Sequence, residues 1–393
     1  MPGSGELTLP YGSSPLPFPR DVGARVIRAP TPVAVPDLAA ALDAALAAPI
    51  GAAPLGAGAQ DRVLVIVSDA SRDEPRAELY AAVRRALPAV PDHHLTLAIA
   101  NGTHAPGPPD GLGLPAQALR AHRVVNHDAR DEAALVEVGR TARGTRVRVN
   151  RCLPEADLVI STGRVKPHYF AGWGGGAKGI FPGLGAEADI RQNHLLKAAP
   201  DARLGRADGN PCREDLEEAA ALAAPRACLL NVVEVGGAVL GAVAGHPVAA
   251  HRAGAALAAP WCEVAASPAD VVVVSAPLPV SASLYQASKL VPPGGALLRD
   301  GGVLVLCAEC PDGVGPLQVV NQGIFALGVR RYLPARYTLF LVSGMPEQVV
   351  AQTYARWAPD LAGALERARE LVGRPAPDVL VLPDASDLVP RPC

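Results

Sequence analysis

The chain has 393 residues, 49% of them hydrophobic and 19% charged, with a formal net charge of −2. This length exceeds one ordinary hydrophobic core and predicts two domains, while the near-neutral charge excludes a basic surface for nucleic acid or for a membrane. The seven cysteines are scattered and odd in number, so they predict free thiols in a reducing compartment rather than a disulfide framework.

The N-terminal residues 1–35 are rich in proline and glycine and predict an irregular arm or an edge strand. They lack the basic segment followed by an apolar segment that marks a signal peptide, so we expect a cytoplasmic protein. The most apolar window, 232–250, is interrupted by Glu234, His246, Pro247 and glycines. It therefore predicts a buried strand, a turn and the start of a helix, and not a membrane span.

Apolar runs of strand length then alternate with segments of helical spacing. The expected strands are RVLVIV (62–67), LTLAIA (95–100) and ADLVIS (156–161). Helical spacing of apolar residues recurs at 36–48, 74–87 and 213–224. This alternation predicts an α/β fold with a mainly parallel sheet flanked by helices.

The same pattern restarts near residue 269. Strands are expected at 270–275, 301–308, 338–343 and 378–384, and helices at 315–328, 346–357 and 361–372. We therefore expect an N-terminal α/β domain over 1–265 and a C-terminal α/β domain over 266–374, with 375–393 either completing the second domain or returning to the first. The active site is expected in the cleft between the domains, a common place for a ligand.

Polar residues follow three of the expected strands: Asp69 and Arg72 in SDASR, Asn101 and His104 in NGTH, and His168 in KPH. Ligands bind at the carboxyl ends of strands in open α/β sheets, so these side chains should converge on one rim. A pair of histidines beside an aspartate and an arginine is typical of acid–base catalysis. Either histidine alone is also compatible with a structural role, and Asp69 with Arg72 could instead cap a helix.

The segment GGGAKG (174–179) matches the dinucleotide fingerprint only formally, because about a dozen residues separate it from the preceding strand. It also lacks the Gly-Lys-Ser/Thr order of a P-loop. Two interpretations remain: a flexible loop, or a loop whose amides approach an anion, with Lys178 as its partner or as a nucleophile. The glycines concerned are Gly174, Gly175 and Gly176.

Three further residues have ambiguous patterns. His194 has no second protein ligand at i+3 or i+4, so a zinc site built from protein side chains alone is not indicated. Gln286 and Lys289 in LYQASK lie three residues apart on an expected helix and share a face. That face is either solvated surface or part of a site.

Together these motifs resemble the nickel-dependent lactate racemase family, the nickel-pincer nucleotide enzymes. Members carry a strand-end Asp-x-x-Arg, a Gly-x-His, a long PHYFAG segment with a following glycine run and Lys-Gly, and an Asn-His. Here these stand as SDASR, NGTH, VKPHYFAGWGGGAKGIFPG and QNH. The segments YQASK and NPCRED (210–215) also look like family landmarks. The resemblance extends from about residue 60 to the end of the chain.

The resemblance implies a covalently bound cofactor, pyridinium-3-thioamide-5-thiocarboxylic acid mononucleotide, which holds Ni(II) in an S–C–S pincer. Lys178 matches the lysine that carries this nucleotide, and His194 matches the histidine that completes the nickel coordination. His104 and His168 match the acid–base pair. Further cofactor contacts would come from Asp69, Arg72, Gly174, Gly175 and Gly176, and substrate contacts from Arg72, Gln286 and Lys289.

The implied activity is racemisation or epimerisation of a 2-hydroxy acid, such as lactate, by reversible hydride transfer. The implied partners are that small molecule and the proteins that make the cofactor. Trp173, Gly174 and Ala177 stand where members often have Phe, Ser and Arg, so the pocket is expected to differ. An NAD-dependent 2-hydroxy acid dehydrogenase and a non-catalytic binding protein of the same fold are the alternatives.

Overall fold

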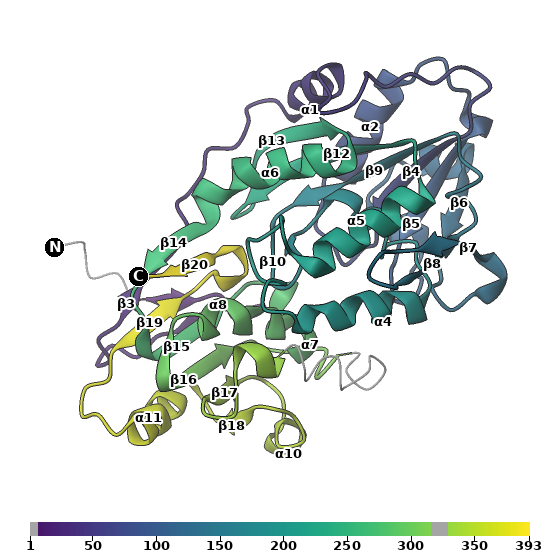
Figure 1. Cartoon of the computed structure of the whole chain (residues 1–393). Helices are drawn as coiled ribbons and strands as arrows, with labels where there is room; N and C mark the ends of the chain where they lie inside the picture. Colours follow the sequence, from purple (N-terminus) through teal and green to yellow (C-terminus); the bar gives the residue numbers. More distant parts are fainter. Residues whose placement is uncertain (1–6, 316–328) are drawn as a thin grey trace. The chain divides into compact units, whose positions relative to one another are not determined.

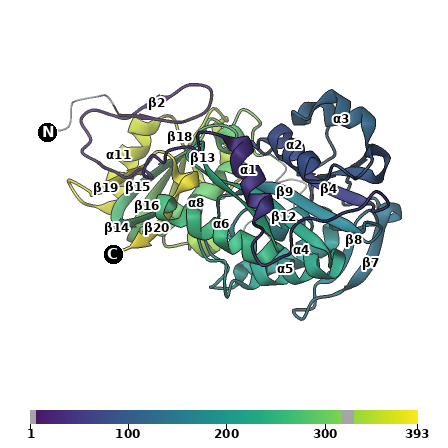
Figure 2. The ribbon, with the colours of Figure 1, turned by 90° about the horizontal axis from the view of Figure 1, so that it is seen from above.

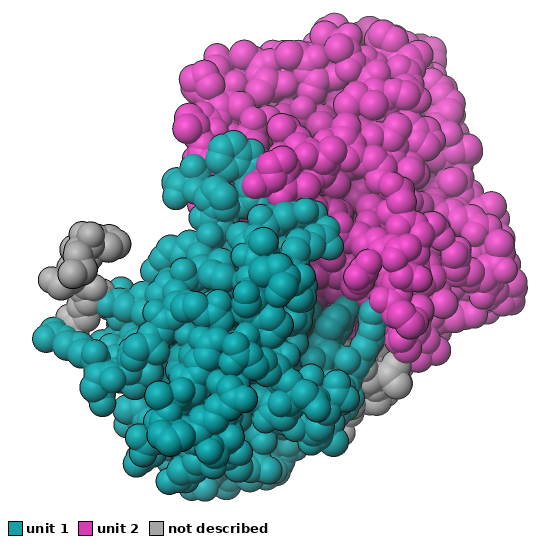
Figure 3. Space-filling model, turned by 60° about the vertical axis from the view of Figure 1, so that its left-hand side comes forward, with its two compact units in different colours: residues 1–31, 261–393 teal, residues 32–260 magenta. Residues whose placement is uncertain are grey.

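The computed structural model describes residues 7–315 and 329–393 (Figure 1). The chain forms two compact units (Figure 3), which we call the central unit (residues 32–260) and the terminal unit (residues 1–31 and 261–393). The bounds of these units differ from the expected domain bounds in two places. The N-terminal arm belongs with the C-terminal part, and the boundary follows Pro260 rather than residue 265.

The central unit is built on a six-stranded sheet with the order β13-β12-β9-β4-β5-β6. Five of these strands run parallel, and β13 pairs antiparallel with β12 at the edge. The strands are β4 (Val63–Ser68), β5 (Leu95–Ala100), β6 (Arg123–Asn126), β9 (Leu158–Val165), β12 (Ala227–Val235) and β13 (Ala238–Gly245). The parallel α/β fold expected from the apolar runs is confirmed.

Helices cover both faces of this sheet because side chains alternate along each strand. In β4, Val63, Val65 and Val67 pack with α1 (Leu38–Ala47) and α2 (Arg76–Ala86). Leu64 and Ile66 belong to the opposite core, with residues of α4 (Glu187–Leu195) and α5 (Pro211–Ala223). Figures 1 and 2 show how these helices are arranged around the sheet. The remaining elements of the unit are α3 (Ala116–Ala121), α4 (Glu187–Leu195), α5 (Pro211–Ala223), α6 (Pro247–Cys262) and the hairpin β7 (Leu135–Arg140) with β8 (Arg146–Asn150).

The terminal unit has a second six-stranded sheet, in the order β18-β17-β16-β15-β19-β3, in which every neighbouring pair is parallel. Its strands are β3 (Arg25–Val26), β15 (Ala269–Ser275), β16 (Leu298–Cys307), β17 (Thr338–Val342), β18 (Arg356–Ala358) and β19 (Val379–Leu382). The pairing of β3 with β19 places the N-terminal arm in this unit and settles the position of the last strand of the sheet.

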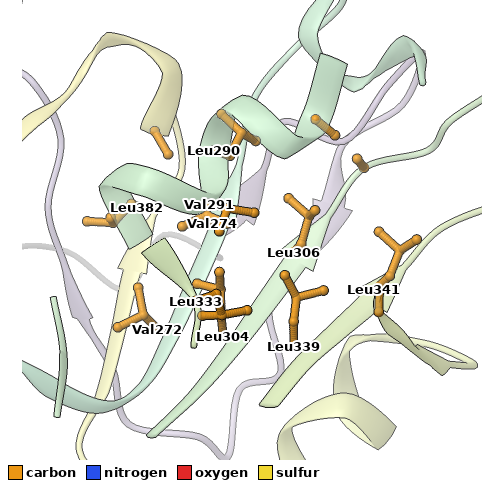
Figure 4. Close-up of a cluster of buried hydrophobic side chains, with 14 of the residues drawn as sticks. Val272, Val274, Leu290, Val291, Leu304, Leu306, Leu333, Leu339, Leu341 and Leu382 are labelled. Atoms are coloured by element: carbon orange, nitrogen blue, oxygen red, sulfur yellow. The ribbon is translucent and has the colours of Figure 1, made fainter. Parts of the chain in front are cut away.

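The core of the terminal unit is apolar (Figure 4). Val272 and Val274 of β15 pack with Leu304 and Leu306 of β16 and with further leucines of neighbouring elements. The helices and short strands around it are α7 (Leu284–Ala287), α8 (Val291–Gly295), α10 (Glu347–Val350), α11 (Leu361–Val372), β1 (Thr8–Leu9), β2 (Leu16–Pro17), β14 (Glu263–Ala266) and β20 (Val389–Pro392).

Within the described ranges, no helix has the length and apolar character needed to cross a bilayer.

Two helix expectations in this unit have different outcomes. The helix at 361–372 is confirmed as α11. The helix at 346–357 is wrong beyond its first turn, since Glu347–Val350 is helical but Arg356–Ala358 is a strand. Thr353 ends the helix, because its hydroxyl donates to Val350 O at 2.7 Å and accepts from Ala355 N at 3.2 Å. The helix expected at 315–328 lies almost wholly outside the described residues.

The winding of the central sheet points to one rim. The chain passes from β4 outward to β5 and β6, then returns to place β9 on the other side of β4. The winding direction therefore changes between β4 and β9, and ligands bind at the carboxyl ends of strands at such a switch point. In the terminal sheet the corresponding change lies between β15 and β19.

Candidate active site

Asp69 and His104 follow the adjacent strands β4 and β5, and their side chains are in contact. His104 Nδ1 lies 2.9 Å from Asp69 Oδ2, and Ser71 N donates to Asp69 Oδ1 at 2.7 Å. Burial alone would raise the pKa of Asp69, but the hydrogen bonds from His104 and Ser71 and the charge of Arg72 lower it to about 2. An ionised carboxylate can only accept, so His104 donates from Nδ1 and carries its lone pair on Nε2 when neutral.

The loop that carries Asp69 is fixed by a buried arginine that the sequence did not single out. Arg76 donates from Nε to Ser68 O at 3.0 Å and from Nη2 to the carbonyls of Asp69 and Arg72. Arg72 itself is exposed, and its guanidinium forms no hydrogen bond or ion pair with the residues that the structure describes. A guanidinium in this position can bind a carboxylate from solution.

His168 is held differently from His104. It lies in β10 (Pro167–His168), which pairs antiparallel with β11 (Gly172–Trp173). Ala171 N donates to His168 Nδ1 at 3.2 Å. This nitrogen is therefore the acceptor, and the neutral ring carries its proton on Nε2. The two histidines expected to act as acid and base are thus held in opposite tautomers.

The ring of Phe170 brings three predicted site residues together. Its centroid lies 4.7 Å from the ring of His168 and 4.9 Å from the ring of His194. The Nζ of Lys178, in the short helix η4 (Gly176–Gly179), is 5.7 Å from the same centroid. Phe170 is buried, and its role as the common neighbour was not predicted.

His194 lies in the last turn of α4 and is neutral near physiological pH. Burial, together with the positive charges of Lys178 and Lys197, lowers its pKa to about 3. Its Nδ1 is buried and forms no hydrogen bond within the described chain. The backbone of Ile190, one turn earlier in α4, raises the pKa of His194, but by less than burial lowers it. A neutral imidazole is the form that ligates metal ions.

The glycine run is fixed by its own contacts. Gly174 N donates to Lys166 O at 2.7 Å, and Gly176 N donates to Asn231 Oδ1 at 2.8 Å. These two amides are committed within the chain, in contrast to the expected approach to an anion. Gly175 has φ 68°, and a Cβ there would lie 2.4 Å from Asn231 Oδ1. Glycine is therefore required by conformation and close packing.

Backbone hydrogen bonds join the loop of His104 to the segment of Lys178. Gly102 N donates to Gly183 O at 2.9 Å, and Gly183 N donates to Lys178 O at 2.9 Å. In the central unit, Asp69 thus contacts His104, and His168, Lys178 and His194 surround Phe170. The convergence of Asp69, Arg72, Asn101, His104 and His168 on one rim stays a prediction.

Gln286 and Lys289 lie in the terminal unit. They belong to α7 and to the following turn η7 (Ser288–Leu290), and Lys289 Nζ donates to Gln286 Oε1. The shared face expected from their spacing is confirmed by this contact. Their approach to the residues of the central unit stays a prediction.

Comparison with known sequences gives matches over most of the chain. Residues 11–205 match the family model of the lactate racemase N-terminal domain. The chain is 29% identical over 296 residues to a lactate racemase of Thermoanaerobacterium thermosaccharolyticum, covering 68% of this chain and 69% of that protein. It is 28% identical over 317 residues to a lactate racemase of Lactiplantibacillus plantarum, covering 78% of this chain and 74% of that protein.

Solved structures extend the likeness to the whole fold. The lactate racemase apoprotein of T. thermosaccharolyticum has a TM-score of 0.87 and 26% identity, covering 98% of this chain and 100% of that one. A Thermotoga maritima protein has a TM-score of 0.64 and 16% identity, covering 90% and 97%, and shares the fold. The fold and these matches define an enzyme of the isomerase class. Within that class, the chain is homologous to the lactate racemases, and residues 11–205 match the model of their N-terminal domain.

Proposed function

We propose that this protein racemises a 2-hydroxy acid such as lactate, using a nickel-pincer nucleotide attached to Lys178. The observation that carries the proposal is the cluster around Phe170, in which the amine of Lys178 and the imidazoles of His194 and His168 all lie next to one ring. The identity to lactate racemases supports the reaction type. The family resemblance of the quoted residues implies the cofactor and the hydride-transfer chemistry.

The residues around Phe170 fit such a cofactor. The amine of Lys178 would carry the nucleotide covalently, and the neutral imidazole of His194 would ligate Ni(II). In the described part of the chain, no group of three or more His, Cys, Asp or Glu side chains is arranged to hold a metal, so the other donors would come from the nucleotide, a set that suits square-planar nickel. When bound, this group would supply a reversible acceptor for the hydride on C2 of the substrate.

The two histidines would move the hydroxyl proton. A racemase must serve a hydroxyl group on either side of C2, and one imidazole does not reach both positions. The carboxylate of Asp69 orients His104 by accepting from Nδ1, which leaves Nε2 to take up and return a proton. His168 must release its hydrogen bond from Ala171 before Nδ1 can bind a proton, so the two histidines are expected to contribute unequally.

The substrate carboxylate requires cationic partners. The exposed guanidinium of Arg72 lies beside the Asp69–His104 pair and presents a planar fork for a carboxylate. Lys289 and Gln286 would bind further substrate oxygens from the terminal unit. Proteins that build the nucleotide would be the macromolecular partners, and a cytoplasmic location would give access to them.

Racemisation of substrate deuterated at C2 tests this proposal. The protein, loaded by co-expression with cofactor-synthesis proteins, is given C2-deuterated L-lactate without NAD, and the D-lactate formed is separated and weighed by mass spectrometry. Hydride transfer predicts that the deuterium remains on C2. Loss of deuterium to water would indicate proton abstraction from carbon, and turnover only with added NAD would indicate a dehydrogenase. A lactate racemase processed in parallel shows that loading succeeded.

A further inference from the structure

The first turn of α5 contacts all three segments that form the cluster around Phe170. This turn contains the sequence NPCRED, Asn210–Asp215, which the proposed chemistry does not use. Its side chains point to the hairpin of His168, to the glycine run before Lys178 and to the residue before His194. Asn210 and Arg213 contact the hairpin and the glycine run, whereas Cys212 and Asp215 contact Asn193, so these two sets of contacts can be separated by substitution.

Arg213 binds the segment that leads to Lys178. It is fully buried, and it donates from Nε to Ala171 O at 3.1 Å, from Nη1 to Gly175 O at 3.3 Å and from Nη2 to Trp173 O. One planar guanidinium therefore fixes three carbonyls within five residues. A carbonyl buried without a partner costs free energy, so this set of three requires a donor with the fork geometry of arginine.

The charge of Arg213 is balanced inside the protein. Glu217, one turn further along α5, lies 3.8 Å from Arg213 Nε and pairs with Arg252 at 2.7 Å. His251 donates from Nε2 to Gly174 O at 2.9 Å, which fixes a fourth carbonyl of the same run. A buried ion pair is weak support for stability, because an apolar replacement is often neutral. We therefore assign to Arg213, Glu217 and His251 the role of fixing the backbone geometry of the glycine run.

Asn210 binds the Phe170 backbone. Its Oδ1 caps α5 by accepting from Cys212 N and Arg213 N, both at 3.1 Å. Its Nδ2 donates to Phe170 O at 2.8 Å and to Arg206 O at 2.9 Å. The residue that begins the helix therefore also sets the position of the ring that His168, Lys178 and His194 share.

Cys212 and Asp215 bind Asn193, the neighbour of His194. Cys212 Sγ donates to Asn193 Oδ1 at 3.3 Å, and Asn193 Nδ2 donates to Asp215 Oδ2 at 2.8 Å. Asp215 is held in turn by the hydroxyl groups of Thr141 at 2.5 Å and Thr145 at 2.8 Å. The end of α4 is thus fixed by contacts that do not involve Arg213.

We propose that Asn210–Asp215 is a positioning element with two separable contacts. Arg213 positions the glycine run for attachment of the nucleotide to Lys178. Asn193, held by Cys212 and Asp215, positions His194 for nickel. This inference rests on the proposed function, because attachment and nickel are its readouts. None of these residues is a catalytic residue, since they act through Lys178 and His194.

The test compares Arg213→Lys with Asn193→Ala in full-length protein loaded by co-expression. Intact mass gives the fraction of chains with an adduct, metal analysis gives nickel per adduct, and thermal unfolding monitors folding. We expect Arg213→Lys to lower the adduct fraction about tenfold with nickel per adduct unchanged. We expect Asn193→Ala to keep the adduct and to lower nickel per adduct about tenfold, the size typical for outer-shell partners.

Glu214→Gln is the matched control, because Glu214 lies in the same turn but contacts Arg143 at 2.7 Å and Gly209 N at 2.9 Å, and glutamine can still accept from Gly209 N. It should match the wild type in both readouts. Proportional loss of adduct and nickel in both variants, or no loss in either, would overturn the inference. If Arg213→Lys does not fold, Asn210→Ser replaces it, since serine keeps the helix cap but loses the bond to Phe170. An unchanged adduct in that variant would also overturn the inference.

The same experiment separates this inference from the proposed function. A wild-type chain without adduct, beside a loaded lactate racemase, would contradict the proposed function itself. A loaded wild type with equally loaded variants would contradict only the positioning role.

Discussion

The two units have similar sheets but different interiors. The main sheet of each unit has six strands, and its winding direction changes next to its first long parallel strand. In the part of the chain that the structure describes, the buried arginine, lysine and histidine residues all belong to the central unit: Arg76, His122, His127, Lys197, Arg213 and His251. Burying such groups costs free energy unless they are paired. Among the described residues, buried cationic and imidazole side chains are therefore a property of the central unit, and the terminal unit has an apolar interior without them.

The largest expected effect is at Lys178. Lys178→Arg keeps the positive charge beside Phe170 but removes the amine, so the covalent adduct should be absent and racemisation should fall to background. Intact mass and chiral chromatography of the product measure the two effects. His194→Gln is the companion variant, and it should lose nickel while keeping the organic adduct. A fully active Lys178→Arg would contradict the attachment of the cofactor to Lys178.

The next effect concerns the two histidines at the rim. Loss of a general acid or base typically lowers turnover by about 10²- to 10⁴-fold, so His104→Gln and His168→Gln should each fall in that range. Because their tautomers differ, we expect unequal losses in the L-to-D and D-to-L directions. Initial rates at saturating concentrations of each pure enantiomer measure this, because the kcat/KM values of the two directions must stay equal when the equilibrium constant is 1. Equal losses in both directions for both variants would contradict the assignment of opposite tautomers.

Asp69→Asn should have a smaller effect. It keeps the size of Asp69 but removes the carboxylate that accepts from His104 Nδ1, so His104 is no longer held in the tautomer that carries its lone pair on Nε2. We expect a loss of about 10- to 100-fold, the size seen when a hydrogen-bond partner that orients a histidine is removed. Steady-state turnover checks this. Turnover equal to that of the wild type would show that the carboxylate does not act through His104.

Substitution in the terminal unit sharpens the contrast between the units. Lys289→Met should raise KM by about 10- to 100-fold, corresponding to a lost charge-assisted hydrogen bond. It should leave the Lys178 adduct and its nickel unchanged. Steady-state kinetics beside intact mass test both parts. Loss of the adduct in this variant would show that the terminal unit also holds the cofactor.

The smallest effect is on stability. The unfolded chain binds a proton at His194 near its ordinary pKa of 6.5, whereas burial lowers the folded pKa to about 3. As the pH falls from 6.5 to 3, protonation of the unfolded chain therefore lowers the free energy of unfolding. The stability that depends on the neutral folded ring is fully present only above pH 6.5. For one histidine the slope is up to about 1.4 kcal/mol per pH unit. Denaturant unfolding of apoprotein should show a shallower dependence in His194→Gln, and an identical slope would contradict burial of the neutral ring.

Much of the fold could be predicted because strong apolar periodicity is local. The runs at β4, β5, β9 and β15 are continuous and end in polar residues, which is typical of buried parallel strands. An edge strand was one of two expectations for residues 1–35, and β3 meets it. Its place could not be predicted, since its two residues depend on pairing with Leu380 and Val381 far along the chain. The unit to which the N-terminal arm belongs could not be predicted for the same reason.

The strand-end positions of Asp69, His104 and His168 could be predicted, because the ends of parallel strands meet at one rim. The supporting residues could not. Phe170 looks like any core aromatic residue, and Arg213 looks like an ordinary charged residue of a helix. Their roles depend on carbonyls and rings brought near by the fold. The NPCRED motif was visible as a landmark, but only the structure connects it to the carbonyls of the glycine run.

Peptide mapping of the wild-type protein after co-expression with cofactor-synthesis proteins tests the central claim most directly. Lys197 is an internal comparison, because its amine is buried near His194, and burial lowers its pKa to about 8. We predict a mass increase on the peptide with Lys178, no increase on the peptide with Lys197, and one nickel per modified chain. An unmodified Lys178 beside a modified lactate racemase, or an adduct on Lys197 instead, would contradict it.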